Sequence, residues 1–284
     1  MTDLLLATCA DWPDGEPGHA ALDAALSERG VDFRWVRWDD PDVDWSAALV
    51  AVRSTWDYDE RRAEFLDWAA SVPRLLNGID VFRWNTDKAY LVGLGDAGVP
   101  VVPTIVVDGE EELPSAIAEF ESAVVKPRVG AGGRGVVALS GRHSDGVAGI
   151  DLSVLGPGPW VVQPLVESVR TEGEYSVFVL GGIPGAGVRK LPAGEEIRVH
   201  EYYGGTTVPV VPTAEASDLA RRAVADAERL IGARLDYARV DAMGLADGTL
   251  AVSELEVTEP GLYLDELPEN GPAFAALVEG RLRR

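Results

Sequence analysis

The sequence has one cysteine, only three histidines and no long apolar run. Cys9 has no possible partner for an internal disulfide, and its apolar surroundings predict a buried structural thiol rather than a nucleophile. No Cys/His motif with metal-ligand spacing occurs. The amino terminus lacks a basic segment, and no run reaches about 18 apolar residues. We therefore expect a cytoplasmic protein with no disulfide, no membrane partner and no Cys/His metal site.

Positive charge is also scarce. The 25 Lys and Arg residues face 47 Asp and Glu residues, so the formal net charge is -22. A protein this acidic opposes the phosphate backbone of nucleic acids and anionic membrane surfaces, and we expect no nucleic-acid partner. With 284 residues, of which 46% are apolar, the chain can bury a sizeable core. The composition predicts a globular protein, and a homodimer stays open.

Short apolar runs alternate with helical patterns, which is typical of α/β layers. We expect an amino-terminal α/β domain over residues 1–84, a central domain over 85–184 and a carboxyl-terminal domain over 185–284. Strands are expected over residues 4–10, 32–38, 48–54, 99–107, 122–127, 135–139, 160–166, 174–182 and near 197–203. Helices are expected over residues 18–29, 59–71, 85–98, 110–120, 214–231 and from 272 onward, with Asn85 as the N-cap of the third.

Three acidic side chains lie on a predicted hairpin near the carboxyl end: Asp241 in RVDAMGL, and Glu254 and Glu256 in VSELEV. A two-residue turn at Asp247-Gly248 would place Asp241 opposite Glu254. The same register places Arg239 opposite Glu256, with all four side chains on one face. Because opposed like charges are unfavourable, a cation should lie between them, and Mg2+ shared with substrate phosphates suits so few carboxylates. The alternative is a solvated hairpin in which Arg239 neutralises Glu256.

A glycine-rich loop follows the strand that ends near Lys126. Its sequence GAGGRG, residues 130–135, satisfies G-x-G-x-x-G, but a strand pattern follows it where a Rossmann unit would open a helix. The Gly-Lys-Ser/Thr of a Walker loop is absent, as are the His-Arg-Asp and Asp-Phe-Gly elements of kinases. Lys126 can reach phosphate oxygens while glycine N–H groups approach them without Cβ obstruction. The loop is predicted to bind phosphate, with an ordinary Gly-rich hairpin as the alternative.

The order of these motifs along the chain resembles the ATP-grasp family. It runs from Lys88 in WNTDKAYL through Lys126 and the glycine loop to Gln163 in VVQPLV, Glu174 in EGEYSVFVL and the acidic hairpin. The resemblance implies an ATP-grasp fold of α+β subdomains with an amino-terminal α/β domain. It also implies an ADP-forming carbon–nitrogen ligase that uses ATP and Mg2+, with two ions expected.

The resemblance further implies a role for each matching residue. The residues expected to bind ATP are Lys88 and Lys126 at the phosphates, Gly130, Gly132, Gly133 and Gly135 over them, Gln163, Leu165 and Val166 at the adenine, and Glu174 at the ribose. Asp241, Glu254 and Glu256 are expected to hold magnesium, although many relatives have Asn where Glu256 stands. Arg189 in GVRKLP and Arg198 in EEIRVHEYYGG are catalytic candidates, since arginine grips a phosphoryl group or a carboxylate with two hydrogen bonds.

Within the family, the pattern is similar to glutathione synthetases and more closely to O-ureido-D-serine cyclo-ligases of cycloserine biosynthesis. RSTWDY at residues 53–58 and TEPG at 258–261 carry this resemblance, which implies antibiotic biosynthesis and an amino-acid-like substrate activated as an acylphosphate. Arg53, Trp56, Tyr202 and Thr206 are expected to line its pocket. Cyclisation of one molecule, intermolecular peptide or amide ligation, and a nucleotide-binding module without turnover are the alternatives.

Overall fold

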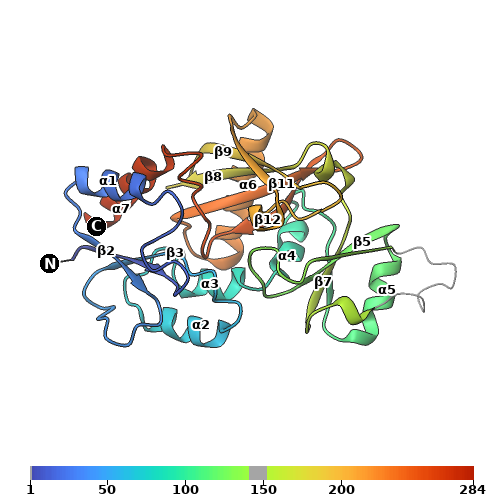
Figure 1. The fold of residues 1–284 in the computed structure, drawn as a ribbon, viewed down its shortest axis with the longest axis horizontal. Helices are drawn as coiled ribbons and strands as arrows, with labels where there is room; N and C mark the ends of the chain where they lie inside the picture. The colour runs from blue at the N-terminus through green and yellow to red at the C-terminus, as the bar shows by residue number, and fades with distance from the viewer. Residues whose placement is uncertain (1, 141–151) are drawn as a thin grey trace.

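The computed structural model describes residues 2–140 and 152–284, and its strands form three sheets (Figure 1). The amino-terminal sheet is parallel and has the order β2-β1-β3. Its strands are β1 (Leu4–Thr8), β2 (Phe33–Arg37) and β3 (Leu49–Ser54), accompanied by α1 (Ala20–Glu28) and α2 (Arg62–Ser71). Every residue of β1 is buried, as expected for the central strand of a parallel sheet. The strands and helices predicted for this unit are confirmed.

The helix predicted from Asn85 to residue 98 is instead two short helices, α3 (Ile79–Asn85) and α4 (Tyr90–Asp96). Asn85 ends α3, so the prediction that it is an N-cap was wrong. Its Nδ2 donates to the Leu255 carbonyl oxygen at 2.6 Å, and its Oδ1 accepts from the Val257 N–H at 3.0 Å. The Asn85 amide therefore ties α3 to the strand that carries the acidic residues.

The central sheet is antiparallel, with the order β4-β7-β5-β6. Its elements are β4 (Ile105–Val107), a 3-10 helix η1 (Glu110–Glu112), α5 (Leu113–Ala118), β5 (Ser122–Pro127), β6 (Val137–Ser140), η3 (Leu152–Val154) and β7 (Trp160–Pro164). The strand predicted over 99–107 is only three residues long. Val101 makes an isolated bridge to Val252, and the proline at 103 removes a backbone donor between this bridge and β4.

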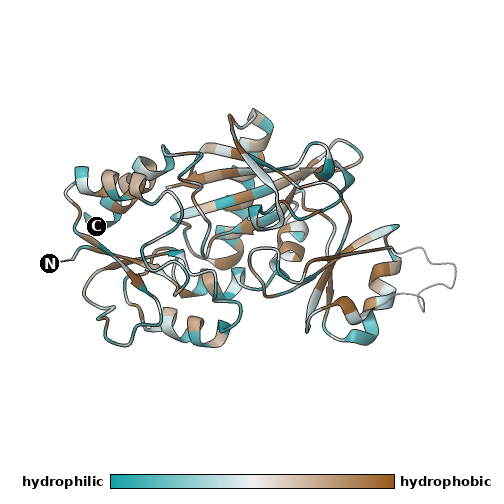
Figure 2. Cartoon of the chain, in the orientation of Figure 1, coloured by the Kyte–Doolittle hydropathy of each residue, from teal (hydrophilic) through white to brown (hydrophobic). Residues whose placement is uncertain are grey.

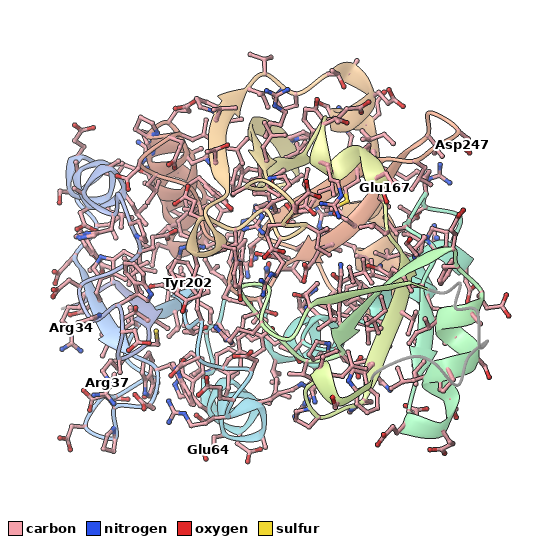
Figure 3. All side chains as sticks on the ribbon, turned by 45° about the vertical axis from the view of Figure 1, so that its right-hand side comes forward. Arg34, Arg37, Glu64, Glu167, Tyr202 and Asp247 are labelled. Atoms are coloured by element: carbon pink, nitrogen blue, oxygen red, sulfur yellow. The ribbon has the colours of Figure 1, made fainter. Side chains whose placement is uncertain are left out.

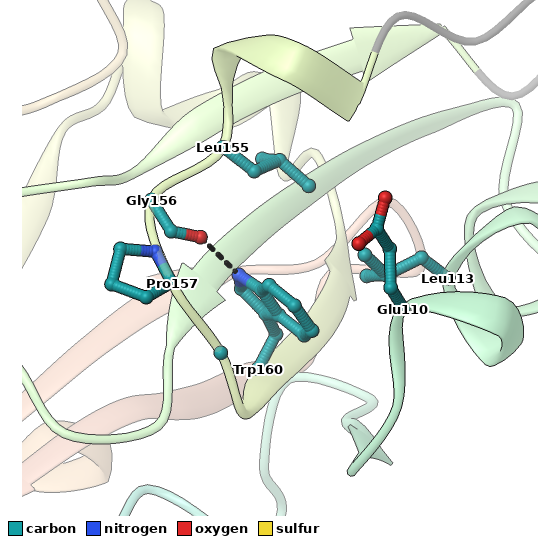
Figure 4. Close-up of a pocket in the computed structure, with 7 residues that line it drawn as sticks. Glu110, Leu113, Leu155, Gly156, Pro157 and Trp160 are labelled. Atoms are coloured by element: carbon teal, nitrogen blue, oxygen red, sulfur yellow. Dashed lines mark hydrogen bonds between the residues drawn. The ribbon is translucent and has the colours of Figure 1, made fainter.

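A hollow beside this sheet is lined by Trp160, two leucines, Glu110 and the backbone of residues 156–158 (Figure 4). The Trp160 Nε1–H donates to the Gly156 carbonyl oxygen at 3.1 Å, and Leu113 and Leu155 lie across the opening. None of the residues predicted to bind ATP, metal or substrate lines this hollow. It belongs to the packing of β7 against α5.

The carboxyl-terminal sheet has the order β10-β9-β8-β11-β12, and every adjacent pair is antiparallel. Its elements are η4 (Glu167–Arg170), β8 (Glu174–Leu180), β9 (Ile183–Leu191), η5 (Glu201–Tyr203), β10 (Thr206–Val210), α6 (Ala214–Ile231), β11 (Tyr237–Gly244) and β12 (Leu250–Glu256). The boundary predicted at 184/185 falls inside β9, whereas β8 and β9 belong to one sheet. The strand predicted near 197–203 is a loop with η5, and β9 and β10 were not predicted.

Helix α6 covers one face of this sheet and was predicted with the correct ends. The Thr213 side chain accepts the Ala216 N–H at 3.1 Å, and Gly232 ends the helix with a φ of 75°. Buried alanines, leucine and valine recur along one side of α6, while Figure 2 shows the hydrophobic colour concentrated in the strands rather than in the connecting loops. This packing leaves the opposite face of the sheet free to carry polar groups.

The last helix, α7 (Asn270–Leu282), returns to the amino-terminal unit and lies beside α1 (Figure 1). Its start, predicted at residue 272, is within two residues of the observed one. Among the described residues, no helix has both the length and the hydropathy needed to cross a membrane.

Candidate active site

The acidic hairpin has the predicted register at its functional end. Asp241 lies opposite Glu254, and Arg239 lies opposite Glu256. The turn, however, is longer than predicted, because Gly244 pairs with Leu250 and the Leu245 N–H donates to the Thr249 carbonyl oxygen. A bulge between Asp241 and Ala242 restores the predicted register. The extra residue in the turn and the extra residue at the bulge therefore compensate each other before the strands reach the acidic side chains.

The Asp241 carboxylate is bonded to two basic side chains, those of Arg239 and Lys190. Arg239 donates to both of its oxygens, at 2.9 and 2.8 Å, and Lys190 Nζ donates to Oδ2 at 3.0 Å. Burial raises the pKa of Asp241, but Arg239 and Lys190 outweigh burial and hold it well below the ordinary value. Lys190 also contacts Glu174 Oε1 at 2.5 Å. Lys190 was not among the predicted site residues, and it bridges two of them.

Glu254 and Glu256 lie in different electrostatic surroundings. Lys88 Nζ lies 2.9 Å from Glu254 Oε1, and burial is outweighed by Lys88 and Lys126, so the pKa of Glu254 is lowered. Burial instead raises the pKa of Glu256 to about 7, despite its contact with Arg239, because Asp241 and Glu254 add their repulsion. The Glu256 carboxylate is therefore short of positive charge.

Lys126 provides a cation that the carboxylates leave free. Its Nζ makes no hydrogen bond or ion pair with the described part of the chain, whereas Lys88 contacts both Glu254 and the Gly130 carbonyl oxygen. Burial lowers the pKa of Lys126, and the neighbouring Lys88 lowers it further, although Glu254 and Glu174 act in the opposite direction. An unpaired, desolvated ammonium group beside a glycine loop is suited to a phosphate oxygen.

The glycine loop lies against both outer units. The Ala131 N–H donates to Asp59 Oδ2 at 3.1 Å, and Arg134 Nη2 donates to the Trp56 carbonyl oxygen at 2.9 Å and contacts Asp59. On its other side, a Cβ added to Gly133 would lie 3.3 Å from the Tyr203 ring. Gly133 also has a φ of 71°, which a side chain would strain. The loop is therefore closed over the cluster of lysines and carboxylates.

Two known protein families match successive parts of the chain. Residues 4–77 match the family model described as the D-cycloserine synthetase DcsG, N-terminal domain. Residues 98–260, more than half of the chain, match the model described as the prokaryotic glutathione synthetase, ATP-grasp domain. The chain belongs to the ATP-grasp family.

Individual relatives agree with this assignment. The chain is 32% identical over 279 residues to the cycloserine biosynthesis protein DcsG of Streptomyces lavendulae, covering 89% of this chain and 90% of that protein. The crystal structure of D-cycloserine synthetase DcsG superposes with a TM-score of 0.83 at 29% identity and covers 98% of this chain and 99% of that chain. A glutathione synthetase of Anaplasma centrale is 30% identical over 66% of this chain and 59% of its own length.

The chain is accordingly an ATP-dependent, ADP-forming carbon–nitrogen ligase with the ATP-grasp fold that the sequence predicts. ATP-grasp ligases use ATP and Mg2+. The ATP-grasp ligase PsnB, in a complex with Mg and ADP, has the same fold at a TM-score of 0.65 and 18% identity, covering 100% of this chain and 99% of that one.

The residues expected at the adenine and ribose are already partly engaged within the protein. The Gln163 side chain is buried, and its Nε2 donates to Thr104 at 2.9 Å, while the Leu165 N–H donates to the Ser122 carbonyl oxygen. The Val166 N–H and the Leu165 carbonyl make no backbone hydrogen bond within residues 2–140 and 152–284. Glu174 Oε2 accepts from Ser253 at 2.8 Å.

Two predicted residues, Arg189 for catalysis and Thr206 for substrate binding, lie on the strands that the sequence prediction missed, each one position away from a residue on the face of the acidic cluster. Arg189 pairs with Tyr175 on the face turned to α6, whereas its neighbour Lys190 faces Glu174 and Asp241. Likewise, Thr207 lies opposite Lys190, and its buried Oγ1 forms no hydrogen bond with the described residues, while Thr206 is exposed. The geometry thus favours Lys190 and Thr207 over the predicted Arg189 and Thr206, and the adjacent lysine in GVRKLP was the available signal.

Arg198 and Tyr202 lie on the loop between β9 and β10. The Arg198 guanidinium stacks 3.6 Å from the centre of the Tyr203 ring and contacts Glu196, which places it beside the glycine loop. The Tyr202 side chain, labelled in Figure 3, is 84% exposed and packs edge-on against Tyr203. The structure brings Arg198 to the edge of the cluster and leaves Tyr202 in solvent.

Arg53 was predicted to line the substrate pocket, and the structure contradicts this. Its side chain is 0% exposed and donates to Glu16 at 2.8 and 2.7 Å and to the Pro260 carbonyl oxygen at 2.8 Å. It also lies 4.8 Å from the centre of the Phe274 ring. Arg53 therefore fastens β3 to the loop after β12, while Trp56, three residues later, remains next to the site through its indole bond to the Glu259 carbonyl oxygen.

The carboxylates fit magnesium by their donor type. Within residues 2–140 and 152–284, no group of three His, Cys, Asp or Glu side chains is arranged to hold a metal ion, because Asp241, Glu254 and Glu256 are paired with basic side chains. All three nevertheless offer oxygen atoms from one strand pair, and burial together with the neighbouring carboxylates raises the pKa of Glu256. These residues suit a hard divalent cation that shares its coordination with phosphate oxygens.

Proposed function

We propose that this ligase activates the carboxylate of an amino-acid-like substrate and joins it to a nitrogen of the same molecule, as an O-ureido-D-serine cyclo-ligase does. The observation that carries the proposal is the likeness to DcsG over 89% of the chain, which includes the amino-terminal unit as well as the ATP-grasp domain. That unit supplies Trp56 and Asp59 to the closed site. A role in antibiotic biosynthesis follows from the same likeness.

The lysines and the glycine loop bind ATP in this proposal. Lys126 takes a phosphate oxygen because its ammonium group has no partner among the residues that the structure describes, and Lys88 exchanges its contact with Glu254 for a second phosphate oxygen. The N–H groups of Gly132, Gly133 and Gly135 cover the phosphates. The Val166 N–H and the Leu165 carbonyl are left to recognise the adenine, with Glu174 at the ribose and Gln163 fixing the hinge through Thr104.

Asp241, Glu254 and Glu256 would hold two Mg2+ ions, which supply positive charge to the transferring phosphoryl group. Lys190 reaches the same face and stabilises the oxygens that gain charge during transfer. Arg198, at the edge of the glycine loop, grips the substrate carboxylate or the transferred phosphoryl group. Tyr202 and Thr206 are exposed and have no role in this proposal.

The chemistry takes two steps in this proposal. A substrate carboxylate oxygen attacks the γ-phosphorus of ATP. The bond between the γ-phosphorus and the oxygen that links it to the β-phosphorus breaks, and ADP leaves with the electron pair of that bond. A substrate nitrogen then attacks the acyl carbon, loses its proton and displaces inorganic phosphate. One carboxylate oxygen therefore departs in the phosphate, whereas transfer to a hydroxyl group would leave the carboxylate intact.

Isotope labelling tests this route. O-ureido-D-serine labelled with 18O in its carboxylate is incubated with ATP and Mg2+, and the phosphate and the product are examined by mass spectrometry. We expect labelled inorganic phosphate and a phosphate-free cyclic product. Turnover with unlabelled phosphate, or a stable phosphorylated product, contradicts acylphosphate chemistry even if ADP forms.

Intermolecular peptide or amide ligation is the second candidate, because residues 98–260 match the glutathione synthetase ATP-grasp domain. It requires a separate amine, so omission of the amine abolishes ADP formation, whereas cyclisation needs one substrate alone.

We also propose a homodimer, since Ile183 is 72% exposed beside an apolar hollow between the β8–β9 hairpin and α7. Sedimentation velocity tests the dimer, and cell fractionation tests the cytoplasmic location expected from the sequence.

A further inference from the structure

Glu259 is a buried residue whose carboxyl group has no partner among the described residues. The residue is 8% exposed, and its side chain makes no hydrogen bond or ion pair with residues 2–140 and 152–284. Burying a carboxylate without a partner is costly, so such a group persists where a ligand can satisfy it. Arg53 of the amino-terminal unit donates to Glu16 and to the carbonyl oxygen of Pro260, the residue next to Glu259. The described part of the chain therefore leaves the Glu259 carboxyl group without a partner.

The backbone fixes Glu259 beside the phosphate-binding cluster. Its carbonyl oxygen accepts the Trp56 indole N–H at 3.1 Å, which holds the loop after β12 against the amino-terminal unit. The charges of Glu256, Lys88 and Glu254 all act on its carboxyl group. The loop that carries Glu259 thus lies against Trp56, whose ring meets that of Trp12 edge-on at 5.6 Å, and its carboxyl group is within electrostatic reach of the cluster.

A second unpaired group comes from the amino-terminal unit. Tyr58 is 4% exposed, and its hydroxyl group makes no hydrogen bond with the part of the chain that the structure describes. Among the charged groups that act on this hydroxyl, Glu259 is the strongest. Glu259 and Tyr58, both more than nine-tenths buried and neither with a side-chain partner among the described residues, thus come from two units that meet at the contact between Trp56 and Glu259.

A ligand that satisfies both groups must be positively charged and must donate several hydrogen bonds. An ammonium group does so, because it has three N–H donors and pairs strongly with a carboxylate. In an α-amino acid the ammonium group is one carbon away from the carboxylate, which suits a subsite next to the phosphoryl-transfer cluster. We propose, resting on the amino-acid substrate class argued above, that Glu259 and the Tyr58 hydroxyl bind the α-ammonium group of the substrate whose carboxylate is activated.

The subsite also has a chemical consequence. An ammonium group held by a carboxylate stays protonated and cannot act as a nucleophile. The nitrogen that attacks the acylphosphate is then a different one, either elsewhere in the same molecule or on a second substrate. Glu259 would therefore select the substrate and prevent its α-nitrogen from reacting.

A matched pair of ligands tests this subsite. Calorimetry measures the affinity of O-ureido-D-serine and of its des-amino analogue, 3-(ureidooxy)propanoate, for the protein saturated with Mg2+ and the non-hydrolysable nucleotide AMPPNP. We expect the native protein to prefer the amino acid by about tenfold or more. Glu259→Gln should reduce the preference to about one, Tyr58→Phe should reduce it partly, and the exposed control Glu269→Gln should keep it. Thermal melting checks that each variant is folded.

The other outcomes separate this inference from the proposed function. If Glu259→Gln keeps the native preference, or instead raises the Mg2+ concentration needed for AMPPNP binding, the ammonium subsite is rejected and the ligase function stands. If both ligands support equal ADP formation in the native protein, the subsite is again rejected alone. If no carboxylate in an amino-acid panel supports ADP formation, the amino-acid substrate and the subsite are both rejected.

Discussion

The β11–β12 hairpin and the β9–β10 pair lie in one sheet and face one cluster, but they contribute opposite charges by different means. The hairpin brings Asp241, Glu254 and Glu256 together through a short local turn. Strands β9 and β10 are joined by residues 192–205 and bring Lys190 against Asp241 and Glu174. The carboxylates of the hairpin repel each other, and that repulsion is offset by Arg239 on the same hairpin and by lysines from distant segments. The acidic half of the site is therefore local in sequence, whereas the fold brings the lysines to it.

The hairpin half is tested most strongly by Glu254→Gln. The variant loses the charge nearest to Lys88 and Lys126, and we expect ADP formation to fall by about 1000-fold because the metal site and the phosphate contacts depend on it. Asp247→Asn, at the exposed turn of the same hairpin (Figure 3), is the control and should keep near-native kcat. A near-native rate for Glu254→Gln would remove Glu254 from the site.

The β9 half is tested by exchanging neighbours on one strand. Lys190→Met should lower kcat by about 100-fold, since it removes a cation from the phosphoryl-transfer face, whereas Arg189→Met should change kcat by less than about threefold. Both variants lose one positive charge and keep a long side chain. If Arg189→Met lowers kcat more than Lys190→Met does, then Arg189 and not Lys190 acts in phosphoryl transfer.

A smaller effect separates Thr206 from Thr207 on the paired strand. Thr207→Val removes the unpaired hydroxyl opposite Lys190 and should raise KM for the carboxylate substrate by about tenfold, on the scale of one lost hydrogen bond. Thr206→Val should leave KM unchanged. Equal KM values for both variants would show that Thr207 does not contact the substrate.

The smallest effect concerns the pH dependence of stability. Burial raises the pKa of Glu256 from 4.5 to about 7, so the folded protein without ligands keeps a proton that the unfolded chain has already lost. Its contribution to the free energy of unfolding is present below about pH 4.5 and is lost as the pH rises to about 7. Relative to the native protein, Glu256→Gln should lose less melting temperature between pH 5 and pH 8. Parallel melting curves over this range would contradict the raised pKa.

Much of the fold was predictable because its elements are local. Helix α6 was predicted with correct ends, which the Thr213 cap and Gly232 mark in the structure, and the turn residues near Asp247 predicted the hairpin. Even there, the register was right although the turn was longer than predicted, since a bulge at the far end compensated. By contrast, Pro184, Gly185 and Gly187 weaken the strand pattern of β9, whose place depends on pairing with β8 and β10.

Placement errors of one residue had large consequences for the candidate site. Side chains alternate between the two faces of a sheet, so a residue can be assigned to a face only when its strand has been recognised. Without β9 and β10, the sequence could not distinguish Arg189 from Lys190 or Thr206 from Thr207. Arg53 was misassigned for another reason: RSTWDY marks a functional loop, but its arginine pairs with Glu16, 37 residues earlier. Sequence patterns identify which segments matter before they identify which side chains do.

The sequence by itself determined the ATP-grasp order of lysines, glycine loop and acidic hairpin, since each of these depends on residues that are close along the chain. Only the tertiary structure decided which charges meet. Lys190 reaches Asp241 across 51 positions, and the loop that carries Glu259 meets the one that carries Trp56 across 203. Electrostatic pairing and burial act through space, so the partner of a buried charge, or its lack of one, is set when the three units pack together.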